Sequence, residues 1–544
     1  MKYSLYSEDI IVDNSKTIVH KINIFCQFFV HTDLSRYKEI VFCLLQNVKN
    51  SNIDKIYLLN ERIYSDKELD ITSDKIVQVN INKRLCYSDV FNYVSINNIQ
   101  GFICIINADI FFNETIKNLH YTHLPSDKLI ISQLRYEYDL QNVSKIFGPR
   151  PDSQDSWIIH SNLIKHIVPY NKVFNFQLGM PGCDNKILYL FNILGFKIIN
   201  DPKFIVTYHY HKQNGRSYTE KDLISKPYCV VQPKNYDIQQ YFKHMDNLSF
   251  YDNSHLYKYI LKQISNNIPF LIPRISGMEN NLAVWAKYAK LSDNDNQKKV
   301  LVENMTNIQF KTILKNNAGI WFEKEDSLFK YSDMYLKSFE NCDMYTGWDK
   351  KSNVYNDTIS FSQNYIQYDL CKNNQQMLCI YSLEIFHYIH YSDTWTKSLR
   401  GKRILLVSEF EESLKKQIPI RENIYGIDLF PDCSFVFIKP PQQTEPSSDI
   451  FNEFQHFCNR LDALKDDYDV ALISCGGYGN LVCNYIYETH NKSSVNVGDV
   501  LQMYFGIGNK KWLTDRKDIV NMYINKHWTI LTDMPNSHTY SYLH

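Results

Sequence analysis

At 544 residues the chain is too long for a single hydrophobic core, so we expect two or more domains. Its content of 44% hydrophobic and 22% charged residues is typical of a folded protein and excludes a disordered one. Lys+Arg and Asp+Glu both number 59, and this charge balance argues against a general nucleic-acid-binding protein.

The 13 Cys residues form no CxxC pair and no cluster with metal-ligand spacing. This argues against a structural zinc site and against a disulfide framework. The N-terminus lacks the apolar core of a signal peptide, and no run reaches the ~18 apolar residues of a membrane span. We therefore expect a soluble protein of a reducing, cytoplasmic compartment, and the sequence leaves open whether it forms a homo-oligomer.

Strands and helices alternate through the first part of the chain. The apolar patterns predict strands at Ile22–Val30, Ile53–Leu59, Lys75–Val79, Phe102–Ile106, Lys128–Leu134 and Gly195–Val206, and helices at Tyr37–Val48, Arg84–Val94 and Lys186–Leu194. Strand–helix–strand alternation at this spacing indicates an α/β fold with a parallel, doubly wound, Rossmann-like sheet.

The first candidate site directly follows the predicted strand Phe102–Ile106. Asn107 and Asp109 come at the carboxyl end of this strand, which is where open α/β sheets bind ligands. Taken alone, the two residues are explained more simply as members of a β-turn.

Later segments add further polar side chains. Asp155 lies in the Pro- and Gly-containing loop 148–161, and Asp184 falls at the start of a predicted helix. There the backbone N–H groups and the helix dipole would keep a carboxylate ionised, although Asp184 alone is more simply a helix N-cap. His209 and His211 alternate in an extended segment and therefore point to the same side, which makes them candidate metal ligands.

Together these motifs resemble the GT-A type nucleotide-sugar glycosyltransferases over about the first 220 residues. The similarity is carried by NADIFF in place of an Asp-x-Asp motif, the DSW loop, the GCDN helix start and the terminal His-x-His. It implies a divalent cation, Mn²⁺ or Mg²⁺, that neutralises the leaving nucleoside diphosphate. Asp109 would bind this metal, and His209 or His211 would complete the site.

The same resemblance implies roles for further residues. Arg84 and Asp89 would belong to the nucleotide-binding segment, and Asn107, which replaces the family's first carboxylate, would contact a ribose hydroxyl. Asp155 would hold hydroxyls of the donor sugar or the acceptor. Asp184 would be the general base on the acceptor hydroxyl, and the reaction would then invert the anomeric carbon.

The pattern loosens between Tyr218 and about Ser254, so we place a boundary near residue 245 and expect domains at 1–245 and 246–544. In the second domain the sequence predicts strands at Phe270–Ile272, Ile404–Val407, Asp432–Lys439, Tyr468–Ser474 and Ser494–Val497, with helices at Leu282–Leu291, Asn304–Leu314, Asp326–Asn341 and Ile450–Leu464. This domain is therefore also α/β, with helical insertions.

Two motifs of the second domain have alternative interpretations. Arg274, followed by a Gly turn and Glu279, could hold a phosphate and its metal, or form a surface ion pair. The CGGYG turn after Ser474 could cradle an anion at a helix N-terminus, or use its glycines only for backbone freedom. It lacks the Lys-Ser/Thr of a P-loop, which argues against an ATPase.

The stretches PRISGME, GKRILLVSEF, DVALISCGGYG and LQMYFGIGNKKW resemble the GT-D type glycosyltransferase domains of bacterial surface-polysaccharide clusters, over roughly residues 265–515. The resemblance implies a donor site with Arg274 and Glu279, although Gly277 replaces the first acid of the family's Asp-x-Glu pair. The residues expected around the phosphates are Ser474, Gly476, Gly477 and Tyr478, with Gln502 and Lys511 as weaker candidates.

We therefore expect a bifunctional glycosyltransferase that moves sugars from UDP- or GDP-type donors to a growing glycan or glycolipid. One alternative keeps a single catalytic domain, the other being a module that binds sugar or a partner. A non-catalytic carbohydrate-binding protein is a third hypothesis. A nucleotidyltransferase should carry a Gly-rich, basic loop near the N-terminus, and residues 22–35 show none.

Overall fold

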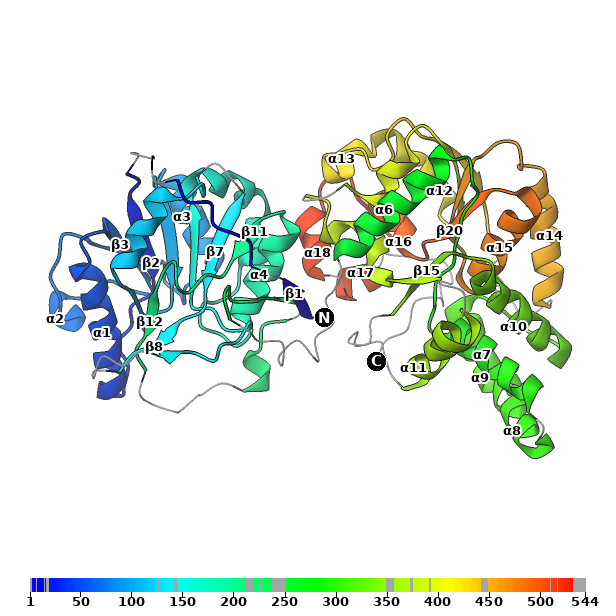
Figure 1. The fold of residues 1–544 in the computed structure, drawn as a ribbon, viewed down its shortest axis with the longest axis horizontal. Helices are drawn as coiled ribbons and strands as arrows, with labels where there is room; N and C mark the ends of the chain where they lie inside the picture. Colours follow the sequence, from blue (N-terminus) through cyan, green and yellow to red (C-terminus); the bar gives the residue numbers. More distant parts are fainter. Residues whose placement is uncertain are drawn as a thin grey trace. The chain divides into compact units, whose positions relative to one another are not determined.

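The computed structural model divides into two compact units, Met1–Leu248 with Tyr388–Tyr391 and Ser249–His387 with Ser392–His544 (Figure 1). Each unit contains a sheet and a hydrophobic core. The structure describes residues 2–5, 7–13, 15, 19–125, 128–139, 145–211, 219–225, 227–236, 250–292, 294–348, 357–371, 375–390, 393–441, 449–508, 510–515 and 517–531.

The main sheet of the first unit has the strand order β11-β7-β10-β5-β2-β3-β4. In that order the strands are Lys197–Ile199, Leu129–Gln133, Ser156–His160, Phe102–Ile106, Ile22–Cys26, Lys55–Asn60 and Ile76–Asn80. The chain runs from β2 outward to β4 and then crosses back to β5. The carboxyl ends of β2 and β5 therefore flank a topological switch point, where open sheets bind ligands.

One strand departs from the parallel sheet that the sequence predicts. β10 runs antiparallel to both β5 and β7. The chain leaves β7 at its carboxyl end and enters β10, and residues 134–139 and 145–155 between them contain no crossover helix of the kind that a parallel connection needs. Ser156 pairs with Ile106, so the residue before β10 lies at the carboxyl end of β5.

A smaller sheet, ordered β6-β12-β8-β9, begins with the strand that follows β5 in the chain. Its strands are Ile110–Phe112, Thr207–His209, Tyr136–Glu137 and Lys145–Ile146. The single strand predicted at Gly195–Val206 is wrong, because β11 and β12 belong to different sheets. Between them the Asp201 carboxylate accepts hydrogen bonds from the backbone N–H groups of Lys203 and Phe204, which makes a turn.

The helices of the first unit are α1 Leu34–Lys49, α2 Asp66–Leu69, α3 Tyr87–Ile96 and α4 Cys183–Ile193. Short 3₁₀ helices are η1 Glu114–Tyr121, η2 Ser161–His166, η3 Val168–Phe174 and η4 Glu220–Asp222. β1 (Lys2–Leu5) pairs with β13 (Tyr228–Val231) in a separate two-stranded sheet. Asp33 is the N-cap of α1, and its side chain accepts the N–H groups of Ser35 and Arg36.

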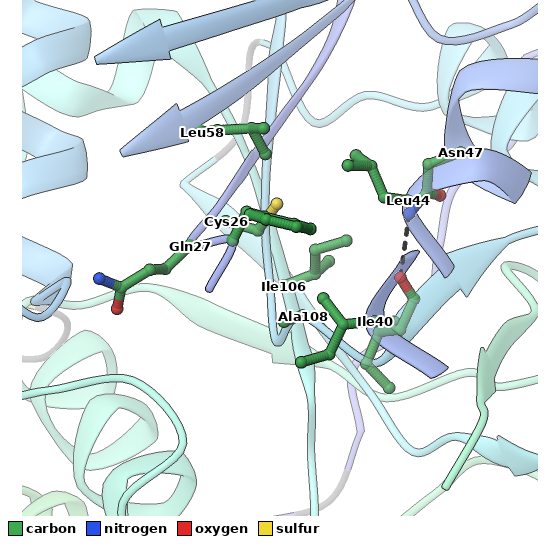
Figure 2. Close-up of a pocket in the computed structure, with 10 residues that line it drawn as sticks. Cys26, Gln27, Ile40, Leu44, Asn47, Leu58, Ile106 and Ala108 are labelled. Atoms are coloured by element: carbon green, nitrogen blue, oxygen red, sulfur yellow. Dashed lines mark hydrogen bonds between the residues drawn. The ribbon is translucent and has the colours of Figure 1, made fainter. Parts of the chain in front are cut away.

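A buried amide joins α1 to the smaller sheet. Asn47 Nδ2 donates to the Ile110 carbonyl at 2.9 Å, and Asn47 Oδ1 accepts from the Phe112 N–H at 3.1 Å. Figure 2 shows Asn47 at the edge of a small recess. Most of the recess wall consists of core side chains such as Phe28, Leu44 and Ile106, so it belongs to the packed interior and is not a substrate pocket.

The second unit contains the sheet β14-β20-β19-β17-β18, whose strand pairs all run parallel. In that order the strands are Leu271–Ile272, Ser493–Asn496, Val470–Ser474, Arg403–Ser408 and Ser434–Ile438. The chain passes from β17 to β18 and then crosses back to β19, so β17 and β19 flank the switch point of this sheet. Two small parallel pairs accompany it: β15 Met344–Gly347 with β16 Gln376–Cys379, and β21 Ile507–Gly508 with β22 Thr529–Ile530.

Helices make up much of the second unit. Their bounds are α6 Phe250–Ser265, α7 Met278–Leu291, α8 Asp295–Thr306, α9 Ile308–Ala318, α10 Glu325–Glu340, α11 Asp357–Asn364, α12 Glu411–Gln417, α13 Glu422–Tyr425, α14 Ile450–Asp462, α15 Gly479–His490, α16 Val500–Tyr504, α17 Lys510–Asp515 and α18 Lys517–Tyr523. η5 Tyr365–Leu370 is a π-helix, and the 3₁₀ helices are η6 Ile380–Leu383, η7 Ile385–His387, η8 Trp395–Leu399, η9 Ile418–Ile420 and η10 Gly476–Tyr478. Helices α7 to α11 gather at one end of this unit (Figure 1).

The single helix predicted at Asn304–Leu314 is wrong. The chain forms α8 and α9 instead, because Asn307 leaves the helical conformation and its side chain caps the N–H of Phe310 at 2.8 Å.

The α/β fold class is confirmed, with a large, mostly parallel sheet of the Rossmann-like kind in the first unit. Among the described residues, no helix combines the length and the apolar character needed to cross a bilayer. All thirteen cysteines have free thiols.

Replacing Asn47 by Ala should leave one N–H and one C=O of β6 unsatisfied. Each buried polar group without a partner costs about 1–3 kcal/mol, so the two together should cost about 2–6 kcal/mol. Denaturant unfolding gives the loss, and hydrogen exchange of peptides covering β6 should show lost protection. Lys38→Ala, an exposed change on the same helix, should cost less than about 0.5 kcal/mol. Unchanged exchange in β6 would contradict the proposed link.

Candidate functional site

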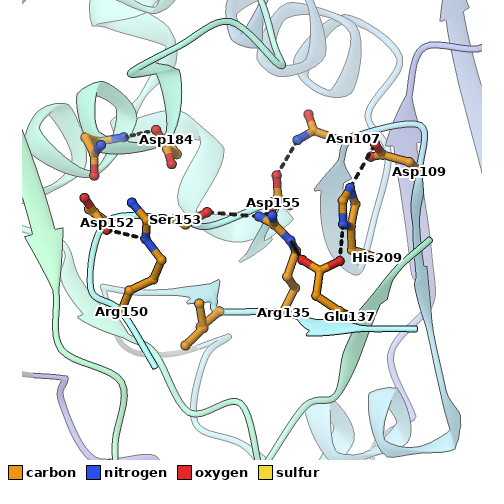
Figure 3. A network of polar contacts seen from close by, with 12 residues as sticks. Asn107, Asp109, Arg135, Glu137, Arg150, Asp152, Ser153, Asp155, Asp184 and His209 are labelled. Carbon is orange, nitrogen blue, oxygen red and sulfur yellow. Dashed lines mark hydrogen bonds and ion pairs between the residues drawn. The ribbon is translucent and has the colours of Figure 1, made fainter. Parts of the chain in front are cut away.

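Two side chains meet where β5 ends. Asn107 follows β5, and the antiparallel course of β10 brings Asp155 to the same edge. Asn107 Nδ2 donates to Asp155 Oδ1 at 2.7 Å, as Figure 3 shows. The residues predicted from separate motifs, 48 positions apart, are therefore neighbours.

Asp109, His209 and His211 form a cluster beside this pair. Asp109 precedes β6, and Ile110 of β6 pairs with His209 of β12. Asp109 Oδ2 lies 3.1 Å from His209 Nε2, and the two imidazole rings stack with their centroids 5.6 Å apart. One ligand atom from each of the three residues lies within 4.8 Å of the others, in a geometry that could hold a metal ion.

The donor set suits the cation expected from the sequence. One carboxylate oxygen and two imidazole nitrogens are ligands that Mn²⁺ accepts, whereas Mg²⁺ prefers oxygen alone. The residues present therefore fit a divalent cation, and they fit Mn²⁺ better than Mg²⁺.

Sequence reasoning missed three charged residues around this cluster. Arg36 Nη2 lies 2.5 Å from Asp109 Oδ2, and Arg36 Nη1 contacts His211 Nδ1 and lies 2.9 Å from Glu39 Oε2. Glu137 Oε2 lies 2.8 Å from His209 Nδ1. The i,i+3 spacing of Arg36 and Glu39 on a helix was visible in the sequence, but Glu137 reaches His209 only through the pairing of β8 with β12.

These charges set the protonation of the cluster. Burial alone would raise the pKa of Asp109, but the charges and hydrogen bonds of His209 and Arg36 hold that pKa well below its usual range. Burial lowers the pKa of His209, but Asp109 and Glu137 raise it overall to about 9. Burial and the Arg36 charge lower the pKa of His211, which favours its neutral form. Metal binding would therefore release a proton from His209.

Arg135 connects the cluster to Asp155. Its guanidinium contacts the Asp155 carboxylate, lies 3.0 Å from Glu137 Oε1 and donates to Ser153 Oγ at 2.9 Å. Figure 3 shows the resulting chain of polar contacts from Asn107 through Arg135 to Asp109. Because Arg135 is 7% exposed, this charge is buried and compensated by its partners.

Asp184 lies in the first turn of α4, where its Oδ1 accepts the N–H of Asn185 at 2.9 Å. The expectation that this helix start keeps the carboxylate ionised is wrong. Burial and the charge of Asp155 outweigh the backbone N–H groups and raise the pKa of Asp184 to about 7. A carboxyl group with this pKa exchanges a proton at neutral pH.

Arg84 and Asp89 have different surroundings. Arg84 Nη2 donates to the Leu178 carbonyl at 3.1 Å, and Gly179 faces both Arg84 and Asn107. The Asp89 carboxylate instead accepts the N–H of Cys86 at 2.9 Å, as the cap of α3, and pairs with Lys83 at 2.8 Å. Arg84 therefore lies near the candidate site, whereas the Asp89 carboxylate is already bonded to Cys86 and Lys83.

In the second unit, Arg274 lies at the carboxyl end of β14. Its guanidinium packs against Gly498 and lies 3.9 Å from Asp499 Oδ1, and its buried Nε has no hydrogen-bond partner in the part of the chain that the structure describes. Asn480 fixes the Arg274 backbone through bonds of 3.1 and 3.0 Å. A buried guanidinium N–H without a partner can accommodate an anion.

Glu279 lies in the first turn of α7, close to two buried tyrosines. Burial chiefly, and the Glu279 charge next, raise the pKa of both Tyr331 and Tyr335. Tyr335 also contacts Ser276 Oγ at 3.0 Å. Ser276 and Glu279 therefore lie near Tyr335, which approaches the Arg274 carbonyl at 3.5 Å.

The glycines of the CGGYG turn, which the sequence proposes as a phosphate cradle, pack closely against α9 and the segment after it. Gly476 packs against the Ala318 carbonyl and Gly477 against Ile320, so that a Cβ on either would clash. The Gly477 carbonyl accepts the Tyr331 hydroxyl at 2.9 Å, and the Tyr478 ring is fully buried. These contacts show that the glycines allow close packing.

The remaining candidates have mixed outcomes. Ser474 ends β19 with 8% exposure, and Gln502 is buried in α16. Lys511 belongs to α17, but its side chain lies outside the described part of the structure.

Glu409 was missed by sequence reasoning. It follows β17 at the switch point of the second sheet, and burial raises its pKa to about 7 against the opposing effect of Lys439. Its position directly after a buried apolar strand was a signal of the same kind as that of Asp109.

No family model matches the chain, and no curated protein matches it. Among solved structures the chain is similar to the mannosyltransferase PcManGT from Pyrobaculum calidifontis in complex with GDP-Man and Mn²⁺, at 10% identity over 61% of this chain and 77% of that chain, with a TM-score of 0.25. It is also similar to GalNAc-T7 with UDP, GalNAc and Mn²⁺, at 11% identity over 56% of this chain and 57% of that chain, with a TM-score of 0.28. Such TM-scores do not establish a shared fold, so the functional assignment depends on the site geometry.

Replacing Arg135 by Met should leave Asp155 and Glu137 without their buried counter-charge. Breaking a buried ion pair in this way costs about 3–5 kcal/mol, which urea unfolding would measure. Arg62→Met removes an exposed pair with Glu68 and should cost no more than about 1 kcal/mol. Equal losses in the two variants would show that Arg135 has no special structural role.

Proposed function

We propose that the first unit transfers a sugar from a nucleoside-diphosphate donor with the help of a divalent cation. The observation that carries this is the cluster of Asp109, His209 and His211 beside the switch point of β2 and β5. A cation bound there would act as a Lewis acid on the departing diphosphate. Asn107 at the carboxyl end of β5, Asp155 before the antiparallel strand β10 and Asp184 in α4 would supply the rest of the site.

The neighbouring side chains have separate proposed tasks. Arg84 and Asn107, which both face Gly179, would bind the nucleotide side of the donor. Asp155, oriented by Asn107 and Arg135, would accept hydrogen bonds from sugar hydroxyls. Asp184, whose pKa is raised to about 7, would take the proton of the acceptor hydroxyl, so the reaction would invert the anomeric carbon.

We also propose a second donor site in the second unit, which would make the enzyme bifunctional toward a growing glycan or glycolipid. The unpaired buried Nε of Arg274 favours it, because a diphosphate oxygen would satisfy that donor. Glu409 supplies a carboxyl group directly after β17, and Glu279 supplies one in the first turn of α7. If this unit only binds sugar or a partner, donor binding should occur there without turnover.

The metal assignment predicts that EDTA abolishes hydrolysis of a UDP- or GDP-sugar and that Mn²⁺ restores it. Asp109→Asn and His209→Ala should each lower the Mn²⁺-dependent rate about 100-fold or more, because a lost ligand weakens both metal binding and leaving-group stabilisation. His166→Ala, at an exposed position, is the control and should leave the rate unchanged. Turnover that persists in EDTA would rule out the assignment.

The raised pKa of Asp184 predicts a pH-dependent stability difference from Asp184→Asn. A carboxyl group whose pKa rises from 3.8 to about 7 on folding stabilises the fold below about pH 4, and this stabilisation is lost as the pH rises through 7. Asp184→Asn should therefore be more stable than the wild type at pH 8, by about 2–4 kcal/mol, but not at pH 4.

Unfolding at several pH values measures this difference, with exposed Asp74→Asn as the control. Asp184→Asn should also lower the transfer rate about 100-fold or more. Parallel stability profiles, or full activity, would contradict the role given to Asp184.

The second donor site is tested in an Asp109→Asn background. UDP or GDP at about one hundred times its dissociation constant should still stabilise the second unit by ~2.7 kcal/mol. Adding Arg274→Gln should remove that thermal shift, whereas exposed Arg400→Gln should retain it. Persistence of the shift in Arg274→Gln would place nucleotide binding elsewhere.

A further inference from the structure

A guanidinium already lies among the candidate metal ligands. Arg36 Nη2 lies 2.5 Å from Asp109 Oδ2, the same oxygen that lies 3.1 Å from His209 Nε2. Arg36 Nη1 contacts His211 Nδ1. One side chain of α1 thus engages two of the three residues that could hold the metal.

The position of Arg36 follows from the charges buried around it. The Asp109 and Glu39 side chains are 13% and 3% exposed, and both pair with Arg36. Buried carboxylates without a counter-charge are strongly destabilising. Arg36, together with His209, therefore supplies positive charge of the kind that a divalent cation would bring to Asp109.

A guanidinium and a metal ion cannot both use the same partners fully. A lone pair of Asp109 Oδ2 that accepts a hydrogen bond from Arg36 is not free for coordination, and two cations a few ångströms apart repel each other. Binding the metal would require Arg36 to leave Asp109. Glu39, at i+3 on the same helix and 2.9 Å away, would keep the guanidinium close by.

We propose that Arg36 is the resident cation of the metal-free site and competes with the divalent cation for Asp109 and His211. This inference depends on the function proposed above. It predicts that the affinity for Mn²⁺ is limited by the displacement of Arg36. The released guanidinium, held by Glu39, would then be available to a phosphate oxygen of the donor.

The test measures the dissociation constant of Mn²⁺ for the full chain, by calorimetry or by the electron paramagnetic resonance signal of free Mn²⁺, and the melting temperature in EDTA. Arg36→Gln should bind Mn²⁺ at least ten-fold more tightly than the wild type and melt at a lower temperature in EDTA. Arg36→Lys keeps the charge and should stay close to the wild type. Arg62→Gln is the surface control.

A second variant keeps the test decisive if Arg36→Gln fails to fold. Arg36→Gln with Glu39→Gln removes both members of an ion pair, and it should show the same tightening of Mn²⁺ binding. Asp109→Asn should abolish binding in either background, which places the measured Mn²⁺ at this site.

Equal or weaker Mn²⁺ binding by Arg36→Gln and by Arg36→Gln with Glu39→Gln, with Asp109→Asn abolishing it, would overturn the competition while leaving the proposed metal site in place. Absence of Mn²⁺ binding in the wild type and in every variant would contradict the metal site itself, and the competition with it.

Discussion

The pairing of β6 with β12 is the constraint on which the candidate site depends. It sets Ile110 against His209 and so places Asp109, one residue earlier, against the imidazole. The amide of Asn47 holds β6 from α1, and the same helix delivers Arg36 to the Asp109 carboxylate. α1 therefore holds β6 through Asn47, and through Arg36 it also supplies a positive charge to Asp109, the residue before β6.

Charge compensation explains why so many ionisable groups can be buried at one sheet edge. Carboxylates and cations alternate through the network, with Asp109, Glu137 and Asp155 contacting Arg36, His209 and Arg135. No member of such a chain needs to be neutral, because each charge has a partner of opposite sign nearby. A charged ligand that binds here can form ion pairs with these side chains, so its charge is not buried without a partner.

The local sequence pattern was sufficient to predict the strand that precedes the site, but not the side chains that pack around the site. The apolar run Phe102–Ile106 predicted a buried strand, and the alternation of His209 and His211 predicted side chains on one face. Arg135 and Glu137 could not be found, because their approach depends on pairings between distant strands. Glycine spacing could not show that Gly476 and Gly477 pack closely against Ala318 and Ile320, because these contacts join segments that are distant in the sequence. The pKa of Asp184 likewise depends on burial and on Asp155, neither of which the sequence displays.

The most direct measurement is a crystal of the chain soaked with Mn²⁺ and examined by anomalous scattering at the manganese edge. A peak within bonding distance of Asp109 and of at least one imidazole of the His209–His211 pair is the expected result. A crystal in which manganese binds elsewhere, while Arg36 keeps its contact with Asp109, would contradict the proposed metal centre.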